Sequence, residues 1–105
     1  FSMHQENLYP LKQKSDLDVG LPDFCKDSEY LYLLRHSLDE ISRKFRPNLV
    51  YYLAGADPFE EDKLGSLKIT KRALIERDLL VKGFAQNVRA KVVILTAGGY
   101  ARNNE

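Results

Sequence analysis

Two short apolar runs constrain the fold of this chain more than any other feature. They are NLVYYLA at residues 48–54 and KVVILTA at residues 91–97, and both are rich in Val, Leu, Ile or Tyr. Nearly continuous apolar runs of this length are typical of strands covered on both faces of a parallel sheet, because a strand with one wet face alternates apolar and polar residues. The sequence therefore predicts a pair of parallel strands in an α/β domain.

The segment between the two runs predicts the crossover helix that such a pair needs. It reads TKRALIERDLLVKGFAQN from Thr70, and we expect the Thr70 side chain to cap its first turn. Strand, helix, strand in this order is a βαβ unit, which is right-handed in nearly all known cases. Arg77 falls within the apolar arc of this helix. We interpret it as a structural residue whose stem snorkels or whose guanidinium pairs with a carboxylate such as Asp78.

An earlier helix is predicted from DSEYLYLLRHSLDEISRKFRP at residues 27–47. Its apolar face repeats at spacings of three and four residues: Leu31, Leu34, Leu38, Ile41 and Phe45. We expect Asp27 to cap this helix and Pro47 to stop it, because the residue before a proline is pushed out of the helical region. Nearer the start, FSMH (1–4) predicts the end of another strand, and SDLDVGLP (15–22) predicts an edge strand.

The totals limit the class of protein. No repeat, linker or low-complexity tract divides residues 1–105, so we expect a single domain. Sixteen basic and 15 acidic residues give a net charge of +1 without a long block of either sign, so neither nucleic acid nor a membrane is an expected partner. Cys25 is the one cysteine, which favours a reducing, cytoplasmic location and an inert thiol.

Chemistry-bearing residues follow both apolar runs. Asp57 comes after the first run, and Gly98, Gly99 and Tyr100 come after the second. Ligands of parallel α/β sheets bind at the carboxyl ends of the strands, so both turns are expected to open on one edge. A carboxylate can bind zinc or magnesium, and a tyrosine hydroxyl can donate to an oxyanion. Gly-Ala-Asp-Pro is also an ordinary turn and Gly-Gly-Tyr an ordinary strand exit, so spacing alone leaves both interpretations open.

A family resemblance favours the functional interpretation. LAGADPFEEDKLGSLKIT and VVILTAGGYARN, preceded in order by SMHQENLYP and SDLDVGLPD…KDSEYL, closely resemble the C-terminal part of the histone deacetylase family. These are zinc amidohydrolases of the arginase/deacetylase fold, and the resemblance covers almost all of the chain. It implies a three-layer α/β/α architecture with a mainly parallel sheet, of which this chain is a part. The short TAGGY form looks more like the class IV and bacterial branches.

The resemblance also implies roles for individual residues. Asp57 matches the family's third zinc ligand, and Tyr100 matches the tyrosine that stabilises the tetrahedral oxyanion. Gly98 and Gly99 match the loop at the base of the acyl-lysine tunnel. Tyr9 falls where many members have a tunnel-lining phenylalanine.

Further positions are compared with the family in the same way. Ser2 and the carbonyl of Met3 match positions around a monovalent-cation site, which potassium would occupy. Asp62, with Gly65, matches the residues that fix the shape of the long turn, whereas Glu60 and Glu61 are interpreted as solvated.

The chain also departs from the family pattern. FCKD stands where the family usually has Gly-Thr-Gly-Asp, which puts the shape of that loop in doubt. The Asp-X-His pair that supplies two zinc ligands and the His-His pair of the general acid/base lie upstream in the family and are absent here. We interpret His36 as solvated, and the family does not use the position of His4 as a ligand.

These observations lead to one main hypothesis and two alternatives. The main one is the C-terminal portion of a zinc-dependent deacetylase for acyl-lysine proteins or acetylated small molecules, inactive as an isolated fragment because its other zinc ligands and base are missing. Phe1 in place of a start methionine, and an end soon after Tyr100, favour a fragment. The first alternative is a non-catalytic remnant or split-gene product that associates through exposed sheet edges. The second is a phosphate- or nucleotide-binding domain, which no glycine-rich phosphate motif supports.

Overall fold

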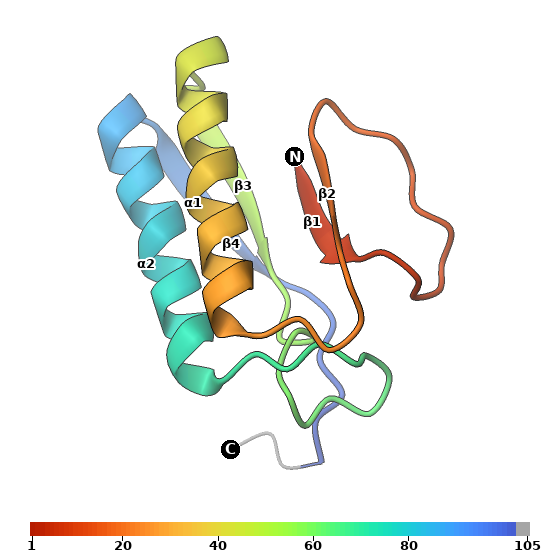
Figure 1. Ribbon diagram of the computed structural model, residues 1–105. Helices are drawn as coiled ribbons and strands as arrows, with labels where there is room; N and C mark the ends of the chain where they lie inside the picture. The colour runs from red at the N-terminus through yellow and green to blue at the C-terminus, as the bar shows by residue number, and fades with distance from the viewer. Residues whose placement is uncertain (103–105) are drawn as a thin grey trace.

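The structure, a computed structural model, describes residues 1–102 (Figure 1). Six elements follow one another along the chain: β1 (Ser2–Gln5), β2 (Asp18–Leu21), α1 (Asp27–Lys44), β3 (Leu49–Ala54), α2 (Lys71–Val88) and β4 (Lys91–Thr96). Two separate parallel pairs form, β1 with β2 and β3 with β4. The predicted order of strands and helices is therefore confirmed.

The β3–β4 pair is the predicted βαβ unit. The strands run parallel from Leu49 opposite Lys91 to Ala54 opposite Thr96, and α2 makes the crossover. The helices α1 and α2 lie side by side against one face of this pair (Figure 1). The other face is open in the described part of the chain, since Tyr51 and Leu53 of β3 and Val93 and Leu95 of β4, which alternate away from the helices, are exposed. The chain thus has α/β architecture with parallel strands, and its described residues form one helical layer and the sheet.

Two buried clusters hold these elements together. One joins β2, the start of α1, the long turn and the start of α2: Leu21, Cys25, Tyr30, Leu67, Ile69 and Ala73. The other lies between the two helices: Leu34, Leu38 and Val81. Cys25 is a buried free thiol, and desolvation raises its pKa to about 11, so it remains protonated at neutral pH and acts as a small apolar residue.

The helix ends agree only in part with the predictions. Thr70 caps α2 as expected, accepting a hydrogen bond from the Ala73 N–H at 3.2 Å. The predicted capping role of Asp27 is wrong, because Lys26 is the N-cap residue of α1 and makes no side-chain cap bond. Instead, the Asp27 carboxylate accepts the N–H and the hydroxyl of Thr70 at 2.8 and 2.7 Å. It therefore ties the starts of the two helices together.

The predicted apolar face of α1 is buried at Leu34 and Leu38 but fails at its end. Phe45 is 64% exposed, because α1 ends at Lys44 and the C-cap Phe45 has an extended backbone that leaves the helical face. The prediction that the helix ends before Pro47 is confirmed.

The loop with the unusual FCKD sequence holds a strained residue. Phe24 has φ 64°, in the left-handed region that favours glycine, and this residue stands where the family usually has the first glycine of its loop. A left-handed conformation costs about 1–2 kcal/mol for a residue with a side chain. Main-chain bonds hold the loop on both sides of this point, from Phe24 N–H to Ser66 O and from Lys68 N–H to Cys25 O. The neighbouring long turn therefore keeps the loop in place despite the change in sequence.

Neither described helix has the length and apolar character needed to cross a membrane.

Candidate functional site

The turns after β3 and β4 are joined by main-chain hydrogen bonds. The Ala56 N–H donates to the Gly98 carbonyl at 2.7 Å, and the Lys63 N–H donates to the Tyr100 carbonyl at 3.2 Å. This follows from the parallel pairing, which places both carboxyl ends at the same edge of the sheet. The predicted juxtaposition of the two turns is therefore found in the structure.

Asp57 and Tyr100 face the same small region beside Gly98. A Cβ atom placed on Gly98 would lie 3.8 Å from Oδ1 of Asp57 and 3.9 Å from Cε2 of Tyr100. Both side chains are exposed, Tyr100 by 57%. A methyl group at this position would make ordinary van der Waals contact with both groups, so the Asp57 carboxylate and the Tyr100 ring lie near each other beside Gly98.

Two other glycines permit the close approach of these turns. A Cβ on Gly99 would lie 2.9 Å from the Cβ of Ala56, closer than side chains pack. A Cβ on Gly55 would lie only 2.5 Å from Oδ1 of Asp57, so the carboxylate folds back over Gly55. Any larger residue at either position would push the turns apart or turn the carboxylate away.

The surroundings of Asp57 disfavour the negative charge of its carboxylate. Partial burial of the carboxylate and, less strongly, the negative charge of Asp62 raise its pKa. Its own backbone N–H and the positive charge of Arg77 lower it. The net effect is a raised pKa, although the residue as a whole is exposed. A carboxylate whose charge is disfavoured in this way gains most when a proton or a metal ion neutralises it.

Asp62 links the two turns through its buried carboxylate. Its Oδ1 accepts the N–H groups of Leu64 and Gly65 at 3.0 and 2.8 Å, and its Oδ2 accepts the Tyr100 N–H at 2.7 Å. Burial by itself raises the pKa of Asp62, but the donors Gly65, Tyr100 and Leu64 outweigh it and hold the pKa below its usual value. The expectation that Asp62 and Gly65 shape the long turn is met, and the bond to Tyr100 extends that role to the second turn.

We expect Asp62→Asn to lower the free energy of unfolding at pH 7 by about 2 kcal/mol, the scale of a hydrogen bond to a charged group. The lowered pKa means that the wild-type contribution is present above pH 4 and is lost as the pH falls through the native pKa. Urea unfolding at pH 7 and pH 3 measures the free energy of unfolding of both proteins. The difference in this free energy between wild type and variant should be smaller at pH 3. The exposed neighbour Glu61→Gln is the control. An unchanged difference at pH 3 would contradict the role of the ionised carboxylate.

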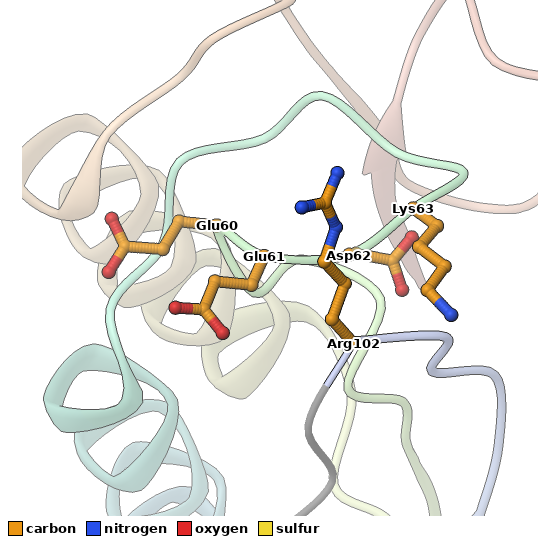
Figure 2. Close-up of a pocket in the computed structure, with 5 residues that line it drawn as sticks. All are labelled: Glu60, Glu61, Asp62, Lys63 and Arg102. Atoms are coloured by element: carbon orange, nitrogen blue, oxygen red, sulfur yellow. The ribbon is translucent and has the colours of Figure 1, made fainter.

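A hollow of about 470 Å³ lies beside this turn (Figure 2). Charged residues line it: Glu60, Glu61, Asp62, Lys63 and Arg102. Glu60 and Glu61 are exposed, as their interpretation as solvated residues expects. Neither Asp57 nor Tyr100 lines the hollow, so it does not coincide with the space beside Gly98. We therefore place the candidate site by the geometry of the two turns.

The remaining predicted site residues lie on β1 and its loop. Tyr9 lies between β1 and β2 and is 91% exposed, so it packs against little of the described chain. The Ser2 hydroxyl lies 2.8 Å from Nδ1 of His4. Met3 pairs with Val19 in the sheet, and its side chain contacts both buried clusters. These contacts are structural, and the cation-binding roles of Ser2 and Met3 and the tunnel role of Tyr9 remain predictions.

Sequence reasoning missed one residue that anchors the long turn. Gln5, at the end of β1, is buried; its amide donates to Asp23 and Ser66 at 2.7 and 2.6 Å and accepts the Ser66 N–H at 2.9 Å. Its Oε1 also lies 3.5 Å from where a Cβ on Gly65 would be. The only signal in the sequence was an amide at the end of a short strand, which by itself indicates no partner.

The described residues do not complete a metal site. Within residues 1–102, no three His, Cys, Asp or Glu side chains come close enough together to hold a metal ion. His36 is exposed and stacks on Tyr32, and His4 is occupied with Ser2. Catalytic zinc needs three protein ligands, so Asp57 by itself cannot hold it.

Comparison with known proteins decides the family. The model of the histone deacetylase domain matches residues 1–104. The chain belongs to the histone deacetylase family. A protein of Picosynechococcus sp. is 41% identical over 104 residues, covering 98% of the chain and 35% of that protein. Histone deacetylase 2 of Arabidopsis thaliana is 35% identical over 106 residues, covering 97% of the chain and 27% of that protein.

A solved structure shows the deacetylase fold directly. The crystal structure of a histone deacetylase homologue complexed with SAHA superposes on the chain with a TM-score of 0.80 and 26% sequence identity, covering 93% of the chain and 29% of the homologue. The chain thus spans about a third or less of the length of these relatives.

Proposed function

We propose that this chain provides one part of the active site of a zinc-dependent deacetylase that hydrolyses acyl-lysine or a related acetyl-amide. The observation that carries the proposal is the placement of Asp57 and Tyr100 on either side of Gly98, on two turns that hydrogen bonds join. Membership of the histone deacetylase family supports it, as does the solution of a structural relative with SAHA bound.

Each residue has a stated task in this proposal. Asp57 is a zinc ligand, and its raised pKa fits a carboxylate that a cation neutralises. The Tyr100 hydroxyl donates a hydrogen bond to the oxygen of the amide carbonyl as negative charge develops there. Gly98 leaves room for that carbonyl, and Asp62 holds the main chain of Tyr100. Zinc, when bound with ligands from outside residues 1–102, would polarise the carbonyl and activate water.

The proposed function also includes an intracellular location and an acetylated substrate. Cys25 is a buried free thiol, which fits an intracellular, reducing environment. An acetylated protein and an acetylated small molecule present the same amide to Asp57 and Tyr100. Residues beyond this pair therefore decide between the two substrates.

A second candidate function rests on the open face of the β3–β4 pair. Large apolar side chains are exposed on this face, which alternates away from the helices: Leu49, Tyr51, Leu53, Val93 and Leu95. An uncovered apolar strand pair tends to associate with another chain. The alternative is therefore a non-catalytic module that associates with a partner or with itself.

One experiment separates the two candidates. Residues 1–104 replace the matching segment of Arabidopsis histone deacetylase 2, and zinc content and hydrolysis of an acetyl-lysine peptide are measured for the chimera, the parent and the 105-residue chain. We expect zinc and activity in the chimera within about tenfold of the parent, and neither in the isolated chain. A folded chimera that holds no zinc, together with concentration-dependent self-association of the isolated chain, would favour the association module.

A further inference from the structure

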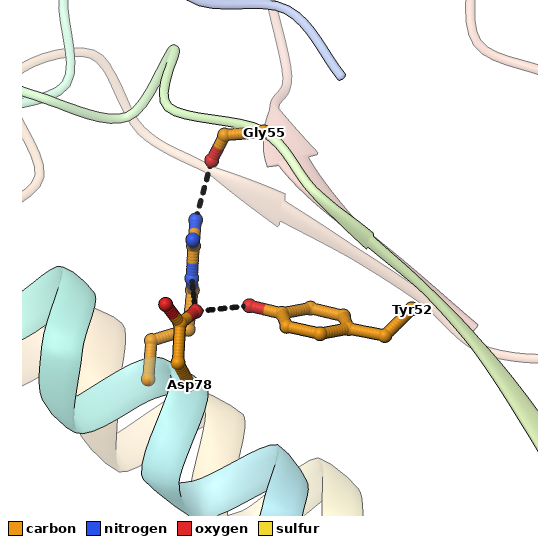
Figure 3. A network of polar contacts seen from close by, with 4 residues as sticks. Tyr52, Gly55 and Asp78 are labelled. Atoms are coloured by element: carbon orange, nitrogen blue, oxygen red, sulfur yellow. Dashed lines mark hydrogen bonds and ion pairs between the residues drawn. The ribbon is translucent and has the colours of Figure 1, made fainter. Parts of the chain in front are cut away.

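A buried guanidinium group lies directly behind the turn that presents Asp57. Arg77 of α2 is only 8% exposed, and its NH1 group donates to the Gly55 carbonyl at 2.6 Å. Its Nε donates to Oδ1 of Asp78 at 2.9 Å. Figure 3 shows Gly55 at the end of β3 and Asp78 on α2, the two partners that these bonds join. The bond to Asp78 agrees with one of the two interpretations that the sequence allowed, a carboxylate pair and a snorkelling stem, whereas the contact with Gly55 comes only from the structure.

The arginine is itself held in a fixed direction. The Tyr52 hydroxyl donates to the same Oδ1 of Asp78 at 2.6 Å, and the guanidinium lies 5.7 Å from the centre of the Tyr52 ring (Figure 3). A planar guanidinium bound on several sides has little freedom to rotate, so NH1 points steadily at the Gly55 carbonyl.

The bond to Gly55 acts on Ala56 because the two residues share a peptide group. The Gly55 carbonyl and the Ala56 N–H belong to one planar unit. Arg77 binds the oxygen of this unit, and the Gly98 carbonyl accepts its N–H at 2.7 Å. One rigid plane therefore connects α2 to the turn that carries Tyr100. Rotation of the plane would break one or both bonds and would move Asp57, which follows directly.

We propose that Arg77 is a positioning residue that holds the Gly55–Ala56 peptide and thereby sets Asp57 against the Gly98–Tyr100 turn. The proposal rests on the proposed function only in naming Asp57 as the group to be positioned. The close approach of Asp57 Oδ1 to Gly55, where a Cβ would lie 2.5 Å away, makes the carboxylate sensitive to the orientation of this peptide. Without Arg77, the Asp57 carboxylate would no longer be held at a fixed position relative to Tyr100.

Amide hydrogen exchange of the 105-residue chain tests the positioning directly. The Ala56 N–H reports on the peptide plane, and the protected amides of the β3–β4 ladder report on global opening. We expect Arg77→Met to lower the protection factor of Ala56 at least tenfold more than that of the ladder. Arg77→Lys keeps the charge but cannot bind Asp78 and Gly55 together, so we expect a selective loss of about threefold. If Arg77→Met does not fold, this lysine variant carries the test.

Val81→Ala is the matched control, because Val81 is buried on the same helix but lies in the cluster between the helices. It should lower the protection of the ladder at least as much as that of Ala56. The proposal is overturned if Ala56 and the ladder lose protection equally in the arginine variants, since Arg77 would then only stabilise the fold.

The chimera shows whether this positioning serves the metal. There, Arg77→Met should weaken zinc binding at least tenfold, with kcat reduced and KM nearly unchanged, and Arg77→Lys should recover part of both. If the Arg77→Met chimera binds zinc as tightly as the unsubstituted chimera, Arg77 does not position a ligand of the metal. Because the exchange experiment uses the chain alone and no metal, its result stands whether or not the chimera is a deacetylase.

Discussion

Asp57→Asn in the chimera is expected to remove bound zinc and to abolish hydrolysis of the acetyl-lysine peptide. Asparagine has nearly the same shape, but its neutral amide oxygen is a poor substitute for a carboxylate ligand. Loss of an outer partner of a metal ligand typically costs 10–100-fold in affinity, so loss of the ligand itself should exceed about 100-fold. Zinc content after dialysis and initial rates measure the two effects.

The fold should survive this change. Asp57 is exposed, and the main-chain partner of its carboxylate is its own N–H. Because its pKa is raised in the native state, the ionised form is slightly destabilising, and Asp57→Asn should leave the unfolding midpoint unchanged or higher. Glu61→Gln, an exposed acid in the same long turn, serves as the control with normal zinc content. Full zinc content and activity in the Asp57 variant would show that Asp57 is not a ligand.

Tyr100→Phe is expected to lower kcat of the chimera about 100- to 1,000-fold while KM changes little, the range seen when one oxyanion donor is removed. The reason is that its hydrogen bond strengthens as charge develops on the carbonyl oxygen in the transition state. The phenylalanine keeps the ring in place, because Asp62 holds this residue through its main-chain N–H at 2.7 Å. Steady-state kinetics on an acetyl-lysine peptide separate the two constants.

Tyr51→Phe provides the matched control, since Tyr51 is an exposed tyrosine on β3. The same hydroxyl is lost, but away from the turns, and kinetics should be unchanged. A Tyr100 variant that loses only substrate binding, with kcat intact, would argue against an oxyanion donor and for a tyrosine that lines the substrate site.

Local signals predicted those features that depend on neighbouring residues. Thr70 caps α2 because an N-cap needs only a hydroxyl and the N–H three residues on. The same reasoning failed for Asp27, whose carboxylate found a partner in Thr70, 43 residues away. It failed again for Phe45, because the periodic pattern continued one residue past the end of α1. A side chain that can satisfy a local bond may still find a better partner through packing.

The sequence by itself determined the parallel β3–β4 pair and the place of Asp57 and Tyr100 at one edge of it. Two parallel strands joined by a crossover helix adopt the right-handed connection in nearly all cases. The parallel direction of the strands then places both carboxyl ends at the same edge. Only the tertiary structure decided what holds the two turns. The bonds from Arg77 to Gly55 and from Tyr100 to Asp62 join residues 22 and 38 positions apart. Such bonds depend on how helices and turns pack, and no local pattern encodes that packing.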